Sequence, residues 1–192
     1  CTGEIVSDQG LVITNHHCSF GMIQAHSSLE HNYLRDGFWA QSMAEELVNP
    51  KITASILVRM EDVTDKINAG LNAGMSESER TKKVNEICRK LESEAVKGTN
   101  LAANIKPYFN GNQYFLSVFK IFRDVRLVGA PNSAIGKFGG DTDNWTWPRH
   151  TGDFSVLRIY AGPDNEPAAI SDKNVPYKPA KFFKISARGV QE

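Results

Sequence analysis

The chain has 192 residues, of which 41% are hydrophobic and 9% aromatic, so it is long enough to bury a core of its own. Its 22 basic residues balance its 22 acidic ones, which excludes a whole-chain field that attracts nucleic acid or an anionic membrane. No apolar run suits a membrane-spanning helix, and we expect a chain that opens on Cys1 and stops at Glu192 without a terminal signal to be part of a longer protein.

The N-terminal segment predicts a β-hairpin that is closed by a disulfide. Residues 1–7 and 11–14 are β-prone, and Asp8-Gln9-Gly10 between them is a turn signal. If Gln9 and Gly10 form a two-residue loop, the ladder sets Cys1 opposite Cys18, at about the Cα separation that a disulfide needs. A Cys1–Cys18 disulfide in turn indicates an oxidising compartment.

The middle of the chain predicts one long helix. Residues 19–49 show no clean apolar period, so we expect loops with short helical turns there, followed by a strand over 52–60 and a short helix over 63–71. The clearest helix covers 76–97, where Ser76 and Glu79 match a capping box and Gly98 a stop. Its apolar stripe, which places Cys88 on the buried face as a free thiol, consists of Val84, Ile87, Cys88, Leu91 and Ala95.

The remaining elements are predicted to be strands. They cover residues 114–122, 124–129, 154–160 and 182–185, and a loop dense in glycine, proline and asparagine spans 130–152. The predicted fold class is therefore mainly β with an α-helical insertion over about residues 61–98.

The segment Gly10-Leu-Val-Ile-Thr-Asn-His-His17-Cys18 carries the strongest chemical signal. It resembles the histidine motif of chymotrypsin-like peptidases, in which a strand after a glycine turn ends in Thr, two further residues and then His. In that alignment His17 is the general base and His16 is not, because chymotrypsin relatives place a disulfide-bonded Cys directly after the base. The alternative is that both histidines are ordinary loop residues.

A zinc site is a second alternative for the same region. His17, Cys18, His26 and His31 are all residue types that zinc prefers. None of the usual paired spacings is present, and the predicted disulfide already uses Cys18. We therefore expect no metal here.

A histidine base needs an acceptor for its second ring N–H, to fix the tautomer and to stabilise the imidazolium. The best candidate is Asp153, at the junction between a polar loop and the strand that begins at Phe154. This place resembles that of the catalytic aspartate in the chymotrypsin fold. The alternative is a carboxylate that caps a turn.

Longer motifs resemble the bacterial dipeptidyl-peptidase 7 and dipeptidyl-peptidase 11 family over nearly the whole chain. They are Cys1-Thr-Gly-Glu, Asn15-His-His-Cys, His26-Ser-Ser-Leu-Glu-His31, Asp36-Gly-Phe-Trp39 and Gly140-Asp-Thr-Asp-Asn-Trp-Thr-Trp-Pro-Arg-His-Thr-Gly-Asp153-Phe. The resemblance implies a chymotrypsin-like double β-barrel of which residues 1–192 form the N-terminal lobe, a large helical domain outside this chain, a homodimer, and a periplasmic or cell-surface location. It implies no metal or organic cofactor.

The resemblance also implies roles for four residues. His17 and Asp153 become two members of a catalytic triad, and Asn144 and Trp145 bind the free α-amino group of a peptide substrate. An ammonium group that loses its water needs acceptors such as the Asn144 carbonyl oxygen, and an indole face attracts a cation. The implied activity is release of dipeptides from peptide N-termini.

The sequence departs from the family pattern in one respect. The serine of that family lies in a glycine-rich motif far downstream, and no serine of this chain has such a setting. We therefore expect the chain alone to be inactive, and its preference for an acidic or a hydrophobic residue before the cleaved bond stays open. Two other functions remain: a non-catalytic peptide-binding module on a peptidase fold, and a zinc-dependent hydrolase.

Overall fold

The computed structural model describes residues 1–137 and 151–189. The chain divides into two compact units, of which the first consists of Cys1–Ala54 and Phe122–Glu192 and the second of Ser55–Ile121. The predicted helical insertion over about residues 61–98 falls within the second unit. The assignment of the whole chain to one barrel lobe stays a prediction.

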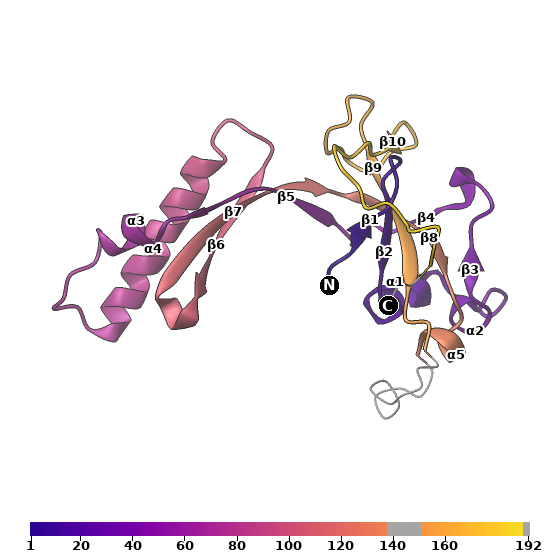
Figure 1. Cartoon of the computed structure of the whole chain (residues 1–192), viewed down its shortest axis with the longest axis horizontal. Coiled ribbons are helices and arrows are strands. Elements are labelled where there is room, and N and C mark those ends of the chain that lie inside the picture. The colour runs from indigo at the N-terminus through magenta and orange to yellow at the C-terminus, as the bar shows by residue number, and fades with distance from the viewer. Residues whose placement is uncertain (138–150, 190–192) are drawn as a thin grey trace. The chain divides into compact units, whose positions relative to one another are not determined.

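The first unit is built on an antiparallel sheet (Figure 1). Its main path has the order β1-β2-β9-β8-β3, with β10 paired to β9 and β4 paired to β8. The strands are β1 (Glu4–Ile5), β2 (Leu11–Thr14), β3 (Phe38–Trp39), β4 (Leu47–Val48), β8 (Asp124–Ala130), β9 (Ser155–Ala161) and β10 (Val175–Pro176). The predicted strands of the C-terminal third are confirmed at β8 and β9. Between Leu127 and Gly129 the β8–β9 register shifts, as at a β-bulge.

The N-terminal hairpin forms with a register different from the predicted one. Glu4 pairs with Ile13 and Ile5 with Val12, and the Val6 N–H donates to the Leu11 carbonyl. The connection is therefore longer than the predicted two-residue loop. The Ser7 hydroxyl accounts for the difference, because it accepts from the N–H groups of Gln9 and Leu11 and so holds a wider turn.

The Cys1–Cys18 disulfide is confirmed, although the hairpin ladder does not make it. Cys18 lies in α1 (His16–His26), which begins where β2 ends, and the two Cα atoms are 6.1 Å apart. The bond therefore ties the N-terminus to the first turn of a helix. The prediction of loops over residues 19–49 missed this helix.

We expect the Cys1→Ser/Cys18→Ser double variant to lose about 3 kcal/mol of stability, because the bond closes a loop of 17 residues in the unfolded chain. Thermal melting with and without a reductant measures the loss. Reductant should lower the melting temperature of the wild type but not that of the double variant. A Cys88→Ser variant, whose thiol is free, is the matched control, and an equal loss there would contradict the assignment.

The core of the first unit lies between α1 and the sheet. Alternate residues of β8 and β9 point toward the helix, as the two-residue period of a strand requires. The buried members of this core are Met22, Ile23, Val125, Leu127, Ala130 and Leu157. Short elements also belong to this unit: α2 (Tyr33–Asp36), the 3-10 turn η1 (Met43–Glu45) and α5 (Ser133–Gly136).

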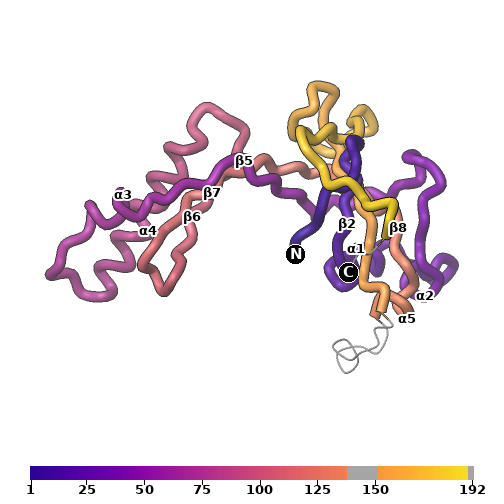
Figure 2. The backbone as a smooth tube through the Cα atoms, viewed as in Figure 1, coloured from indigo at the N-terminus to yellow at the C-terminus, as the bar shows by residue number. Residues whose placement is uncertain are grey.

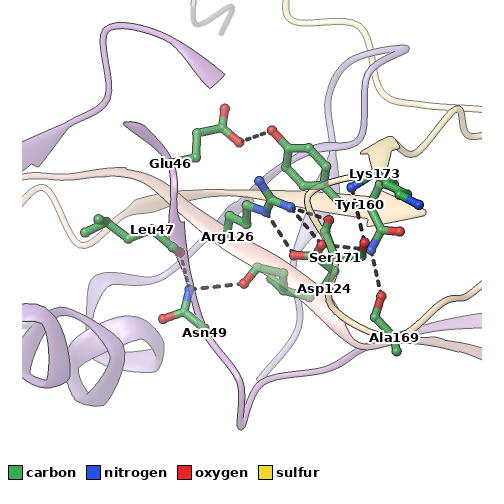
Figure 3. A network of polar contacts seen from close by, with 11 residues as sticks. Glu46, Leu47, Asn49, Asp124, Arg126, Tyr160, Ala169, Ser171 and Lys173 are labelled. Carbon is green, nitrogen blue, oxygen red and sulfur yellow. Dashed lines mark hydrogen bonds and ion pairs between the residues drawn. The ribbon is translucent and has the colours of Figure 1, made fainter. Parts of the chain in front are cut away.

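A second cluster of the first unit is polar (Figure 3). Asp124 is fully buried and accepts two hydrogen bonds from the Arg126 guanidinium, each 2.9 Å long. The guanidinium carbon lies 3.9 Å from the centre of the Tyr160 ring, and the Tyr160 hydroxyl donates to Glu46 over 2.8 Å. Glu46 also pairs with Arg158 over 2.8 Å. Every charge in this cluster therefore has a partner of opposite sign.

The second unit packs helices on a three-stranded sheet with the order β5-β7-β6 (Figure 1). Its elements are β5 (Ala54–Asp62), α3 (Thr64–Asn68), α4 (Glu77–Ala95), β6 (Ala102–Tyr108), the 3-10 turn η2 (Phe109–Gly111) and β7 (Gln113–Phe122). The predicted helix is confirmed as α4, with Ser76 and Glu79 forming both bonds of the capping box. Its whole predicted stripe packs on the core, and Cys88 is a half-buried free thiol. Burial raises the pKa of that thiol, which keeps it protonated.

One strand assignment was wrong, and four strands were missed. Residues 182–185 form no strand, although the Phe183 N–H donates to the Ile5 carbonyl. The strands that were not predicted are β3, β4, β6 and β10. The described part of the chain is thus mixed α/β with two sheets, more helical than the mainly β class that the sequence indicated. Within that part, no helix has the length and apolar character needed to span a membrane.

Candidate functional site

His17 and Asp153 lie side by side in the first unit. The Nδ1 atom of His17 is 2.7 Å from the Oδ2 atom of Asp153, although 136 residues separate the two in sequence. An ionised carboxylate can only accept, so Nδ1 carries the proton and donates it to Asp153. Nε2 is then the basic nitrogen, on a side chain that is 65% exposed. This is the orientation that a general base requires.

The sheet brings the two residues together. β2 and β9 run side by side and antiparallel, with Thr14 paired to Ser155, so the end of one strand meets the start of the other (Figure 2). His17 follows the end of β2, and Asp153 precedes β9. The Phe154 N–H donates to the Gly152 carbonyl over 2.9 Å, which makes Asp153 the centre of a tight three-residue turn.

Asp153 also caps the N-terminus of α1. Its Oδ1 atom accepts from the His17 backbone N–H over 3.0 Å. Asn15 occupies the N-cap position but makes no cap bond, and its side-chain amide donates to Asp153 Oδ2 over 3.2 Å instead. A carboxylate that is distant in sequence thus satisfies one of the free N–H groups at the start of the helix.

These contacts control the charge of Asp153. Partial burial alone would raise its pKa, but the bonds from the His17 backbone and ring outweigh burial, so the pKa lies below its usual value. Asp153 is therefore ionised at neutral pH. A fixed negative charge beside Nδ1–H favours the tautomer described above.

His16 has a different environment from its neighbour. Its side chain is 1% exposed, and burial lowers its pKa despite the nearby negative charge of Asp153. His16 is therefore neutral at pH 7 and cannot reach a substrate. Of the two histidines, only His17 has the geometry of a base.

The residues of the zinc alternative are dispersed. Cys18 is in the disulfide, the Nε2 atom of His26 lies 3.1 Å from the Asn49 side-chain oxygen, and the His31 ring stacks on Tyr33. Among residues 1–137 and 151–189, no group of three or more His, Cys, Asp or Glu side chains could hold a metal ion. The other two predicted site residues, Asn144 and Trp145, lie outside the described residues.

Sequence reasoning missed one contributor to this site. The Asn15 side-chain amide donates to Asp153, yet Asn15 was assigned no role. The available signal was the Asn15 residue type, since asparagine directly before a helix is a common N-cap. It was not recognised because the helix after it shows no clean apolar period.

The chain is similar in sequence to known peptidases. The sequence profile described as Peptidase S46 matches residues 1–192. The chain is 51% identical over 192 residues to an "Asp/Glu-specific dipeptidyl-peptidase" of Capnocytophaga gingivalis, covering 100% of this chain and 27% of that protein. It is 50% identical over 189 residues to "Dipeptidyl-peptidase 7" of Porphyromonas gingivalis, covering 98% of this chain and 26% of that protein.

The fold is similar to solved structures as well. DPP11 of Porphyromonas endodontalis, crystallised in complex with substrate, superposes with a TM-score of 0.89 at 46% identity over 100% of this chain and 29% of that chain. Its complex with the dipeptide Arg-Glu gives a TM-score of 0.85 at 46% identity, over 100% of this chain and 28% of that chain. The present chain thus spans about a quarter of the length of the proteins that it matches.

Proposed function

The chain belongs to the peptidase S46 family, and from this premise we propose that it supplies the histidine and aspartate of a serine dipeptidyl-peptidase. The observation that carries the proposal is the 2.7 Å contact between His17 Nδ1 and Asp153, on a ring that is exposed. A neutral Nε2 held in one orientation is what a serine hydroxyl needs as a proton acceptor.

In the proposed reaction the serine comes from outside this chain. The serine oxygen attacks the carbonyl carbon of the second residue of the peptide, while the serine proton moves to His17 Nε2. His17 then gives the proton to the departing amine, and a water molecule releases the dipeptide from the acyl-enzyme through the same steps. Asp153 stabilises the imidazolium in both halves without taking the proton.

The remainder of the protein is part of the same proposal. We infer that the first unit belongs to the N-terminal lobe of a chymotrypsin-like double barrel, and that the complete enzyme adds a serine-bearing lobe and a large helical domain. The support is that the S46 relatives are nearly four times as long as this chain. Dimerisation and a periplasmic or cell-surface location are proposed on the family resemblance, and the disulfide is consistent with such a location.

The substrates proposed are peptides with a free N-terminus. Relatives of nearly equal identity include an Asp/Glu-specific enzyme and a dipeptidyl-peptidase 7, so this chain favours neither preference for the residue before the cleaved bond. Asn144 and Trp145 are proposed to bind the α-ammonium of the substrate. Anchoring that group at a fixed distance from His17 selects the second peptide bond, because only this register brings its carbonyl to the serine.

The anchor is tested by kinetics on the complete enzyme with one peptide in free and N-acetylated forms. Asn144→Ala should lower kcat/KM for the free peptide, since the ammonium would lose a charge-assisted hydrogen bond of about 1.5–3 kcal/mol. The acetylated peptide should be a poor substrate of the wild type and change little. Equal losses on both forms would show that Asn144 supports the fold or the triad instead.

A further inference from the structure

A side chain continues the contact between β2 and β9 beyond their paired residues. The last pair of that ladder is Thr14 with Ser155, so Asn15 and Asp153 both lie just past it. A ladder of backbone bonds fixes only the residues that it pairs. At this point the Asn15 amide nitrogen lies 3.2 Å from the Asp153 backbone oxygen and 3.2 Å from its Oδ2 atom. One side chain therefore holds both the backbone and the carboxylate of Asp153.

The partners of the Asn15 amide determine its orientation. A backbone carbonyl and an ionised carboxylate can only accept, so the amide NH₂ group rather than the amide oxygen faces Asp153. The backbone of Asn15 is held as well, because the hydroxyl of the fully buried Ser155 donates to the Asn15 carbonyl over 3.2 Å. Three side-chain hydrogen bonds thus join residue 15 to residues 153 and 155.

The carboxylate of Asp153 needs such support, because the torsion that turns an aspartate carboxylate has only a broad preference. A bond to the His17 ring alone would leave the carboxylate plane poorly defined. Oδ1 accepts from the His17 backbone N–H over 3.0 Å, whereas Oδ2 accepts from Asn15 and lies 2.7 Å from His17 Nδ1. The donors on the two oxygens together fix one plane, in which Oδ2 faces the ring.

We propose that Asn15 is a positioning residue, whose side-chain amide fixes Asp153 in the orientation that receives the His17 Nδ1–H. Helix capping does not account for asparagine here, because Asn15 occupies the N-cap position of α1 without making a side-chain cap bond. The inference rests on the proposed function and adds to it a residue that acts through Asp153.

Aspartate at residue 15 separates positioning from helix capping. It has the shape of asparagine and is an equally good N-cap, but its ionised carboxylate has no hydrogen to donate to Asp153. In the complete enzyme we expect Asn15→Asp and Asn15→Ala each to lower kcat about tenfold, because a hydrogen bond to a charged group is lost. KM should stay similar, since Asn15 acts on Asp153 and not on the substrate. Wild-type kcat in either variant would overturn the proposal.

Thr14→Val is the matched control at the same end of β2. The Thr14 hydroxyl donates to the Thr2 carbonyl over 2.7 Å, and valine has nearly the same shape without a donor. This change removes a side-chain hydrogen bond that is not directed at Asp153, so kcat should stay unchanged. A tenfold loss in Thr14→Val would show that any lost bond at this strand end has the same effect, and would contradict a specific role for Asn15.

The side chain of Asn15 is exposed, so both of its variants should fold, and melting temperatures check that kcat is compared among folded molecules. Wild-type release of dipeptides and its loss in His17→Ala are measured first. An inactive wild type, or full activity of His17→Ala, would refute the proposed function and this inference with it. An active, His17-dependent wild type with unaffected Asn15 variants would refute only the positioning role.

Discussion

Replacing His17 with alanine in the complete enzyme is expected to lower kcat by about 10⁴-fold or more, and Asp153→Asn by a similar factor. The first change removes the proposed proton acceptor. The second keeps the size of the side chain but removes the charge that fixes the Nδ1–H tautomer of His17. Initial rates at saturating substrate measure both losses.

His16→Ala is the comparison that identifies the base. The His17 side chain is 65% exposed, so its loss should leave the melting temperature nearly unchanged, whereas loss of the buried His16 ring should lower it. Among molecules that remain folded, His16→Ala should retain far more activity than His17→Ala. The opposite ranking would show that the two histidines have been assigned the wrong way round.

A large loss of stability is expected for Asp124→Ala. The carboxylate is fully buried, and its removal leaves the Arg126 guanidinium, whose side chain is 13% exposed, without its ionic partner. Breaking such a pair costs about 3–5 kcal/mol. We expect the lower end, because Arg126 keeps its bond to the Ser171 carbonyl and its contact with the Tyr160 ring. Thermal melting at pH 7 measures the loss.

The stability of the wild type should depend on acidic pH in a way that the stability of Asp124→Ala does not. Burial alone would raise the pKa of Asp124, but the hydrogen bonds from Arg126 and Asn174 outweigh it, so the folded-state pKa is below that of the unfolded chain. The resulting stabilisation is complete above the unfolded value of about 4 and is lost as the pH falls through the folded value.

The difference in melting temperature between wild type and Asp124→Ala should therefore narrow as the pH falls below about 4. A difference that stays constant over this range would contradict the assigned ion pair. Asp36→Ala provides the control, because Asp36 also pairs with an arginine but its side chain is 51% exposed, and solvent screens that pair. We expect no measurable change there.

Local sequence signals were sufficient to predict an element where one segment determines its own structure. The helix α4 has its capping box, apolar stripe and glycine stop within a single stretch, and all three were readable. The strand β6 lacks such signals, because Ala102, Ala103 and Pro107 are poor strand formers and its pairing with β7 decides its conformation. The hairpin register was missed for a related reason, since one serine hydroxyl sets the width of the turn.

The candidate site also combines features that a local segment predicts with features that depend on distant contacts. The motif around His17 and the junction before β9 were sufficient to single out His17 and Asp153, because both are local features of the sequence, and the structure brings the two side chains within 2.7 Å of each other. The helix α1 was not predicted, since the group that caps it is a carboxylate 136 residues away. The support from Asn15 depends on the approach of the same carboxylate, so it became visible only in three dimensions.

The capping of α1 by Asp153 has a consequence for the order of events during synthesis. A ribosome that has completed the first turn of α1 must still add more than a hundred residues before the carboxylate that caps it exists. Until β9 pairs with β2, the start of the helix has no anionic cap and His17 has no carboxylate to orient it. The hydrogen bond that fixes the His17 ring therefore forms only after most of this region has been translated.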